Sequence, residues 1–240
     1  MITYNQIMDE KLVRIKTANK IRILPFYKRI GFQYPVYVKE SVAKKLLVAA
    51  NKLPDGYYLQ IDSGYRTIKS QKQIWLERYM QFEKQNPTFT NNEIIKMTND
   101  LVFNPKYGTP PHTTGGAVDV SLLDRNKKEI NLSEPFANFY DEPQLKSNKI
   151  SKKSQQLRLA LNKIMLENGF APHPNEYWHF SYGDKIWAEY YNKKVKYKQT
   201  NNLPRALKPT IFEVHLRRFV RFLYHKKRYL SKLYRGLGRP

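Results

Sequence analysis

The 240-residue chain has no cysteine, few acidic residues and no long apolar run. Without cysteine it can form neither a disulfide nor a thiolate metal site, so any metal must be held by histidine, aspartate or glutamate. No stretch approaches the roughly 18 consecutive apolar residues of a membrane-spanning helix, and the first ten residues lack the apolar core of a signal peptide. These absences predict a cytoplasmic protein, or one that lies peripherally on a membrane.

The shortage of acidic residues leaves a formal net charge of +23, and the excess is concentrated at the carboxyl end. From Asn192 onward 15 lysines and arginines face one acid, Glu213. We therefore expect a catalytic domain at residues 1–191 and a basic extension at residues 192–240. Within the extension, residues 210–233 mix apolar and basic side chains in a pattern that predicts an amphipathic helix.

Two interpretations of this helix carry equal weight. It either lies on an anionic membrane surface, where each cation contributes about 1 kcal/mol, or packs on its own domain with a solvated basic face. Nucleic acid is a less favoured partner because no known nucleic-acid-binding motif accompanies the charge. The sequence does not determine an oligomeric state.

Three short segments contain the residue types of a zinc peptidase: Ser63-Gly-Tyr-Arg66, His112-Thr-Thr-Gly-Gly-Ala-Val-Asp119 and Glu176-Tyr-Trp-His179. A catalytic zinc needs three protein ligands and an open position for water. His112, Asp119 and His179 fit that count, with one Zn²⁺ per chain. A nearby carboxylate must take the proton of the water, and a fixed cation would stabilise the oxyanion. Glu176 and Arg66 are the candidates for these two roles.

The candidate residues could also have a purely structural role instead of a role in metal binding or catalysis. Asp119 lies in an apolar, strand-prone run, where a buried carboxylate needs a partner that a metal or a salt bridge between the segments would supply. His173, which is flanked by prolines, is a rival metal ligand. In a flat strand Glu176 and His179 would face opposite sides, so we expect a bend or bulge near Tyr177.

The segments also resemble a known family. The middle one resembles the S-x-H-x-x-G-x-A-x-D signature of the zinc D,D-peptidases of the hedgehog/lysostaphin-like group, and the last resembles their E-x-W-H signature. The continuation from Trp178 to Ala188 is most similar to the D-alanyl-D-alanine dipeptidases. This resemblance, which spans about residues 34–190, implies zinc on His112, Asp119 and His179. It also implies Glu176 as general base, Arg66 as the group that polarises the carbonyl, and hydrolysis of D-Ala-D-Ala.

Two positions depart from the family pattern and concern the substrate. Pro110 replaces the serine that opens the middle signature, and Ser63 stands where dipeptidases often carry an aspartate, with Asp62 beside it. The alternatives are therefore a D,D-carboxypeptidase or endopeptidase acting on peptidoglycan peptides, or a wall-peptide-binding module without turnover. The presence of Glu176 and Arg66 favours an enzyme, because a binding module needs no general base.

The pattern of apolar residues predicts an α+β fold. Helical spacing occurs at residues 40–51, 67–85 and 154–167, and a further helix starts at the capping box Thr90 to Glu93. Strands are expected at residues 57–63, 117–122 and 177–182. Gly115 and Gly116 supply the turn that brings His112 back toward Asp119. We expect a small, mainly antiparallel sheet that carries the zinc on its open face, with helices packed on the other side.

Overall fold

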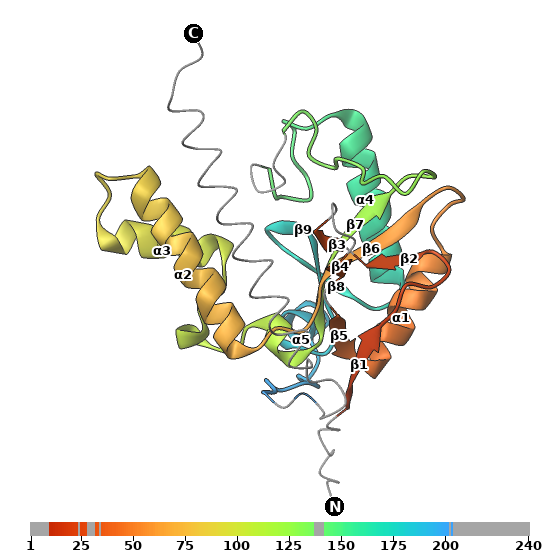
Figure 1. Cartoon of the computed structure of the whole chain (residues 1–240), viewed down its shortest axis with the longest axis horizontal. Helices are drawn as coiled ribbons and strands as arrows, with labels where there is room; N and C mark the ends of the chain where they lie inside the picture. Colours follow the sequence, from red (N-terminus) through yellow and green to blue (C-terminus); the bar gives the residue numbers. More distant parts are fainter. Residues whose placement is uncertain are drawn as a thin grey trace, which may run out of the picture. The chain divides into compact units, whose positions relative to one another are not determined.

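The computed structural model describes residues 10–23, 25–27, 32–33, 35–136, 142–201 and 203 (Figure 1). Residues up to Asn202 form one compact unit. The amphipathic helix expected at residues 210–233 lies outside the described residues. Within the described part of the chain, no helix is long and apolar enough to cross a membrane.

A five-stranded sheet with the order β2-β6-β7-β9-β8 forms the centre of this unit (Figure 1). The strands are β2 (Ile21–Ile23), β6 (Tyr58–Ser63), β7 (Ala117–Leu123), β8 (Ala171–His173) and β9 (Glu176–Ser181). Only the β2–β6 pair is parallel among the pairs of this sheet, so the expected mainly antiparallel sheet is confirmed. The three predicted strands are its three central ones.

Alternation along β7 gives the sheet two different faces. Val118, Val120 and Leu122 are buried in the main core, whereas Asp119 and Ser121 point to the opposite face. Helices α1 (Glu40–Asn51) and α4 (Lys152–Glu167) cover the apolar face. The polar face of β7 is thereby left for a functional site, as the sequence predicted.

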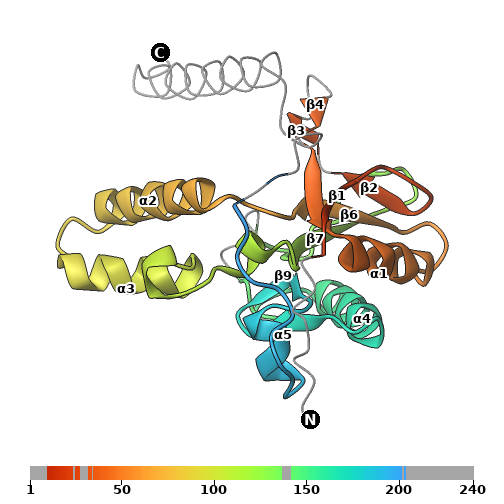
Figure 2. The ribbon, with the colours of Figure 1, turned by 90° about the horizontal axis from the view of Figure 1, so that it is seen from below.

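Helices α2 (Ile68–Gln85) and α3 (Asn91–Leu101) form an antiparallel pair beside the sheet (Figure 2). Thr67 caps α2 by accepting a hydrogen bond from the Ser70 amide, and the predicted capping box of Thr90 and Glu93 begins α3. Because α2 starts directly after β6, Arg66 lies at a strand-to-helix junction.

The elements that the sequence did not reveal are all short. Strands β1 (Leu12–Ile15) and β5 (Val36–Lys39) form a separate antiparallel pair, as do β3 (Pro25–Tyr27) and β4 (Phe32–Gln33). The 3₁₀ helices η1 (Pro105–Tyr107) and η2 (Pro111–Thr114) lie between α3 and β7, and α5 (Lys185–Tyr190) follows β9. Segments of two to six residues are too short to show a period.

Residues 192–200 continue along the compact unit without regular secondary structure. Tyr197 is buried, and its hydroxyl donates a hydrogen bond of 2.5 Å to Glu10 and lies 2.6 Å from Ser41 Oγ. Glu10 in turn accepts a hydrogen bond from the Ser41 amide in the first turn of α1, where Lys39 provides no side-chain cap. The two ends of the described chain are thus joined at the start of α1. The division after residue 191 stays a prediction.

We expect Tyr197→Ala to lower the free energy of unfolding by about 3 kcal/mol, because it removes a buried ring and one of the donors to Glu10. Tyr197→Phe keeps the ring and should cost about 1 kcal/mol. Tyr190→Ala is the control, since Tyr190 is 52% exposed and should change stability by less than about 0.5 kcal/mol. Urea unfolding of the full chain measures all three. Equal stability of Tyr197→Ala and Tyr190→Ala would show that the contact of Tyr197 with Glu10 and Ser41 does not stabilise the fold.

Candidate metal centre

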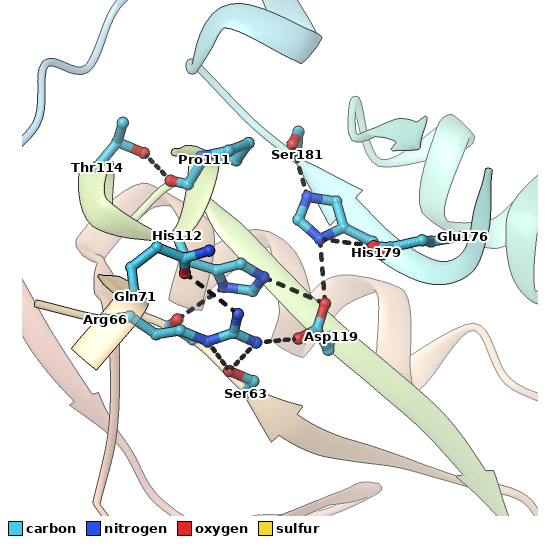
Figure 3. Close-up of polar contacts among 11 residues, drawn as sticks. Ser63, Arg66, Gln71, Pro111, His112, Thr114, Asp119, Glu176, His179 and Ser181 are labelled. Atoms are coloured by element: carbon cyan, nitrogen blue, oxygen red, sulfur yellow. Dashed lines mark hydrogen bonds and ion pairs between the residues drawn. The ribbon is translucent and has the colours of Figure 1, made fainter. Parts of the chain in front are cut away.

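The polar face of the sheet brings together His112, Asp119 and His179, although they come from three separate segments (Figure 3). Their candidate ligand atoms all lie within 4.8 Å of one another. Asp119 on β7 and His179 on β9 are direct partners in the strand register, and His112 comes from η2. Both histidines are buried, and Asp119 is nearly so.

The turn that returns the chain from His112 to β7 depends on two glycines. Gly115 has a φ of +77°, a left-handed conformation that other residues adopt only at a cost. A Cβ on Gly116 would lie 2.3 Å from the carbonyl oxygen of Tyr182, so a side chain has no room there. The predicted role of these glycines is confirmed, since they let η2 end directly at the strand that carries Asp119.

The expected irregularity near Tyr177 is also present. In the β8–β9 pairing, Pro172 faces Phe180 but the next residue, His173, faces Glu176, so β9 carries extra residues at this point. This bulge brings Glu176 Oε2 within 3.7 Å of His179 Nδ1 (Figure 3). Glu176 and His179 therefore lie at one site despite their spacing of three.

Hydrogen bonds on the far side of each imidazole select the nitrogen that faces the centre. His112 Nδ1 lies 2.8 Å from the carbonyl oxygen of Gly64, which can only accept, so Nδ1 carries the proton and Nε2 is free to bind a metal. His179 Nε2 lies 3.3 Å from Ser181 Oγ, and its Nδ1 faces Asp119. Partners of this kind behind metal-binding histidines orient the ring and fix its tautomer.

The spacing of these atoms fits a zinc ion. Asp119 Oδ1 lies 3.2 Å from His112 Nε2 and 3.1 Å from His179 Nδ1. Ligand bonds of about 2.0–2.2 Å in a tetrahedron place neighbouring ligand atoms about 3.3–3.6 Å apart. The two distances from Asp119 differ from this by only a few tenths of an ångström, and two imidazoles with one carboxylate are a donor set that zinc prefers.

Burial and neighbouring charges set the protonation of the group. Burial, together with the Arg66 cation, lowers the pKa of His112 to about 4, which leaves this imidazole neutral at pH 7. Burial alone would raise the pKa of Asp119, but His112, His179 and Arg66 outweigh it and hold this pKa well below its ordinary value. The carboxylate is therefore charged and the His112 ring neutral, as metal binding requires.

Arg66 holds the second oxygen of the same carboxylate. Its Nη2 donates to Asp119 Oδ2 at 2.7 Å, and Ser63 Oγ accepts from Nε at 3.1 Å and from Nη2 at 2.9 Å (Figure 3). Gln71, buried on α2, lies 3.5 Å from Nη1 and also donates to the Phe103 carbonyl oxygen at 3.0 Å. The guanidinium is therefore fixed by the sheet on one side and by the α2–α3 pair on the other.

A central cavity of about 490 Å³ opens beside the three candidate ligands. The sheet side contributes His112, Asp119, Glu176 and His179, and the opposite wall includes residues of α2 and α3. Burial raises the pKa of Glu176 to about 7, so this carboxylate holds a proton more tightly than an ordinary glutamate. A carboxylate of this kind, next to a possible metal and an open cavity, is placed to exchange protons with bound water.

Pro110 and Ser63, the two residues that depart from the family pattern, lie at different places relative to the cavity. Pro110 lines the cavity, whereas Asp62 and Ser63 do not. Asp62 is turned toward Gln60 and Ser121, which both donate hydrogen bonds to it. Ser63 instead orients Arg66, a role that the sequence did not suggest.

Sequence reasoning missed several residues that support the site: Gly64, Gln71, Ser181 and Asp184. A Cβ on Gly64 would lie 2.5 Å from the Tyr37 carbonyl oxygen, so only glycine fits where His112 is anchored. Asp184 caps α5 through the Trp187 amide, just after Ser181. Ser181 and Asp184 lie within the motif that carries the resemblance, and that motif was the available signal. Nothing in the sequence near Gln71 suggested contact with Arg66.

A histidine–aspartate–histidine set beside a glutamate and an open cavity is typical of metal-dependent hydrolases. The chain belongs to the D-ala-D-ala dipeptidase family, whose model matches residues 14–199. This membership confirms the resemblance seen in the sequence and identifies the protein as a peptidase. A D-alanyl-D-alanine dipeptidase of Synechocystis sp. is 27% identical over 200 residues, which cover 70% of this chain and 79% of that protein.

The solved structures that are similar to the chain include two of VanY enzymes. The vancomycin resistance D,D-pentapeptidase VanY in complex with Zn(II) has 21% identity and a TM-score of 0.40, covering 61% of this chain and 73% of that one. VanYB in complex with D-alanine-D-alanine has 19% identity and a TM-score of 0.43, covering 76% and 90% respectively.

We expect Arg66→Lys to weaken Zn²⁺ binding about 10- to 100-fold, because lysine keeps the charge but cannot hold Asp119 and Ser63 together. Arg78→Lys is the matched control. Arg78 lines the same cavity but bonds to Gln81, so its replacement should leave zinc affinity unchanged. Competition with a chromophoric chelator measures both. Equal zinc affinity of the two variants would show that Arg66 does not orient Asp119.

Proposed function

We propose that this protein is a zinc D,D-peptidase that hydrolyses the bond between two D-alanine residues, with the free D-Ala-D-Ala dipeptide as substrate. The observation that carries the proposal is the Glu176 carboxylate 3.7 Å from His179, at the edge of a cavity that His112 and Asp119 also line. Membership of the D-ala-D-ala dipeptidase family and the name of the Synechocystis relative support the choice of substrate.

In this proposal His112 Nε2, Asp119 Oδ1 and His179 Nδ1 hold one Zn²⁺. When bound, the metal lowers the pKa of a water molecule and polarises the scissile carbonyl. The residues around it have separate tasks. The Gly64 carbonyl keeps His112 in the tautomer that leaves Nε2 free, and Ser181 Oγ can accept from His179 Nε2, which leaves Nδ1 free.

Glu176 is the proposed general base. Its Oε2 takes a proton from the attacking water and later delivers it to the leaving amino group, as the D-alanyl-D-alanine bond breaks. Its position in the β9 bulge allows both steps, because the carboxylate lies beside His179 and still lines the cavity.

Arg66 has two proposed tasks. Through Nη2 it fixes the Asp119 carboxylate, and as a cation that lines the cavity it stabilises the oxyanion through Nη1, whose long 3.5 Å bond to Gln71 leaves N–H capacity. Only the second task acts directly on the substrate. Three of the hydrogen bonds that Arg66 donates go to Ser63 and Asp119. Arg66 therefore orients Asp119 as well, a role that the sequence did not suggest.

The alternative is a D,D-carboxypeptidase or endopeptidase acting on longer peptidoglycan peptides. The observation that favours it is the position of Asp62, which is turned toward Gln60 and Ser121 and does not line the cavity. Asp62 is therefore unavailable to bind a free substrate amino group. A wall-peptide-binding module without turnover needs no carboxylate placed like that of Glu176.

The test measures D-alanine release from free and from N-acetylated D-Ala-D-Ala, with and without zinc. Zinc-dependent cleavage of the free dipeptide alone is expected. Preference for the acetylated form would favour the carboxypeptidase, and cleavage of neither would contradict the proposal.

Glu176→Ala should retain one zinc per chain but lose at least about 100-fold in kcat, the usual contribution of a general base. Glu189→Ala is the control, because Glu189 is a surface residue of α5 paired with Lys185 at 3.6 Å. Metal content by mass spectrometry and initial rates give the two readouts. Near-normal turnover of Glu176→Ala would refute the assigned base.

We also propose that the basic residues after Asn202 attach the enzyme to anionic membranes. Their charge, and the apolar residues interspersed at 210–233, are the basis for this. The full chain should sediment with phosphatidylserine vesicles at low salt, and a chain ending at Asn202 should not. Equal sedimentation of the two would reject the membrane role and favour packing on the domain.

A further inference from the structure

His173 is a third imidazole at the central cavity, and neither the metal set nor the proposed mechanism uses it. It ends β8 and faces Glu176, the first residue of β9, across a tight connection formed by Pro174 and Asn175. Directly opposed residues in such a pair place their side chains on the same side. His173 and Glu176 both line the cavity, and the rings of His173 and His179 are 5.3 Å apart.

The hydrogen bond of this ring fixes its tautomer. The backbone N–H of Asn175 donates to His173 Nδ1 at 3.2 Å. A nitrogen that accepts cannot carry a proton, so the neutral ring has its proton on Nε2. Nε2 has no hydrogen-bond partner among the described residues, and His173 lines the cavity. The same bond turns Nδ1 away, so His173 is not part of the group formed by His112, Asp119 and His179.

A hydrogen-bond donor such as His173 Nε2–H could stabilise negative charge on a substrate carbonyl oxygen at this site. Arg66 is the only described cation that touches a candidate ligand, and most of its N–H groups are bound to Ser63 and Asp119. It stands on the β6–α2 side of the cavity, whereas His173 stands on the β8–β9 side. A carbonyl bound beside Glu176 would therefore have one partly used donor on one side and a free N–H on the other.

We propose that His173 is a catalytic residue that donates its Nε2–H to the oxygen of the scissile carbonyl and stabilises the oxyanion together with Arg66 Nη1. The inference rests on the proposed D,D-peptidase function and adds a second donor to it. It also assigns the rival metal ligand of the sequence a different task. No proton is transferred from His173, because its role is a hydrogen bond that strengthens as negative charge develops on the oxygen.

The test compares zinc-loaded full-length wild type with His173→Leu and His173→Gln. Removal of one oxyanion donor costs about 100- to 1,000-fold in kcat. His173→Leu should therefore lose about 100-fold in kcat with little change in KM, and it should keep one zinc per chain. His173→Gln, whose amide can donate, should recover at least about tenfold over leucine. Thermal unfolding checks that both variants fold.

A second readout separates this inference from the proposed function. A phosphinate analogue of D-Ala-D-Ala, whose tetrahedral phosphorus replaces the scissile carbon, should bind wild type about 100-fold more tightly than His173→Leu. Calorimetry measures this without turnover, so an inactive wild type would refute the proposed function and still allow His173 to be judged. Equal phosphinate affinity, or loss of zinc from His173→Leu, would overturn the role of His173. If wild type binds no phosphinate, both proposals fail.

Discussion

The site depends on a single buried carboxylate. Asp119 Oδ1 lies between His112 and His179 at 3.2 and 3.1 Å, and its Oδ2 binds Arg66 at 2.7 Å. A charge in the interior is tolerated only when it is paired and hydrogen-bonded, so each of these neighbours is needed for the strand to carry aspartate at this position. The same carboxylate therefore joins three segments of the chain and supplies the negative ligand of the candidate metal centre.

Local backbone irregularities deliver the partners of Asp119. A regular sheet would have placed Glu176 and His179 on opposite faces, and only the bulge in β9 puts both at the cavity. Gly115 and Gly116 allow η2 to end beside β7, and Gly64 allows its carbonyl oxygen to reach His112 Nδ1. The regular strands and helices support the site, and the backbone irregularities at these three points bring its side chains together.

The sequence predicted most of the central elements, and it singled out the five residues proposed for metal binding and catalysis, for two reasons. The strands and long helices have clear periods, and Asp119 is conspicuous because aspartate is rare in a buried strand. It did not reveal β1, β5 and α5, which are too short to show a period. It also missed the support of Arg66 by Gln71, and the tautomer of His173 set by Asn175, because these depend on side chains and amides that meet only in the folded chain.

The residues proposed for catalysis and the opposite wall of the cavity come from different parts of the fold. Asp119, His179 and Glu176 stand on the sheet and His112 on the adjoining η2, where strand pairing and burial hold them in place. The far wall of the cavity comes from α2, α3 and the residues just after α3, and Gln71 of α2 links this wall to Arg66. Changes on the exposed parts of that helical pair can alter which peptide fits without moving Asp119. Because Gln71 bonds to Arg66, changes at the base of the helical pair would also move Arg66.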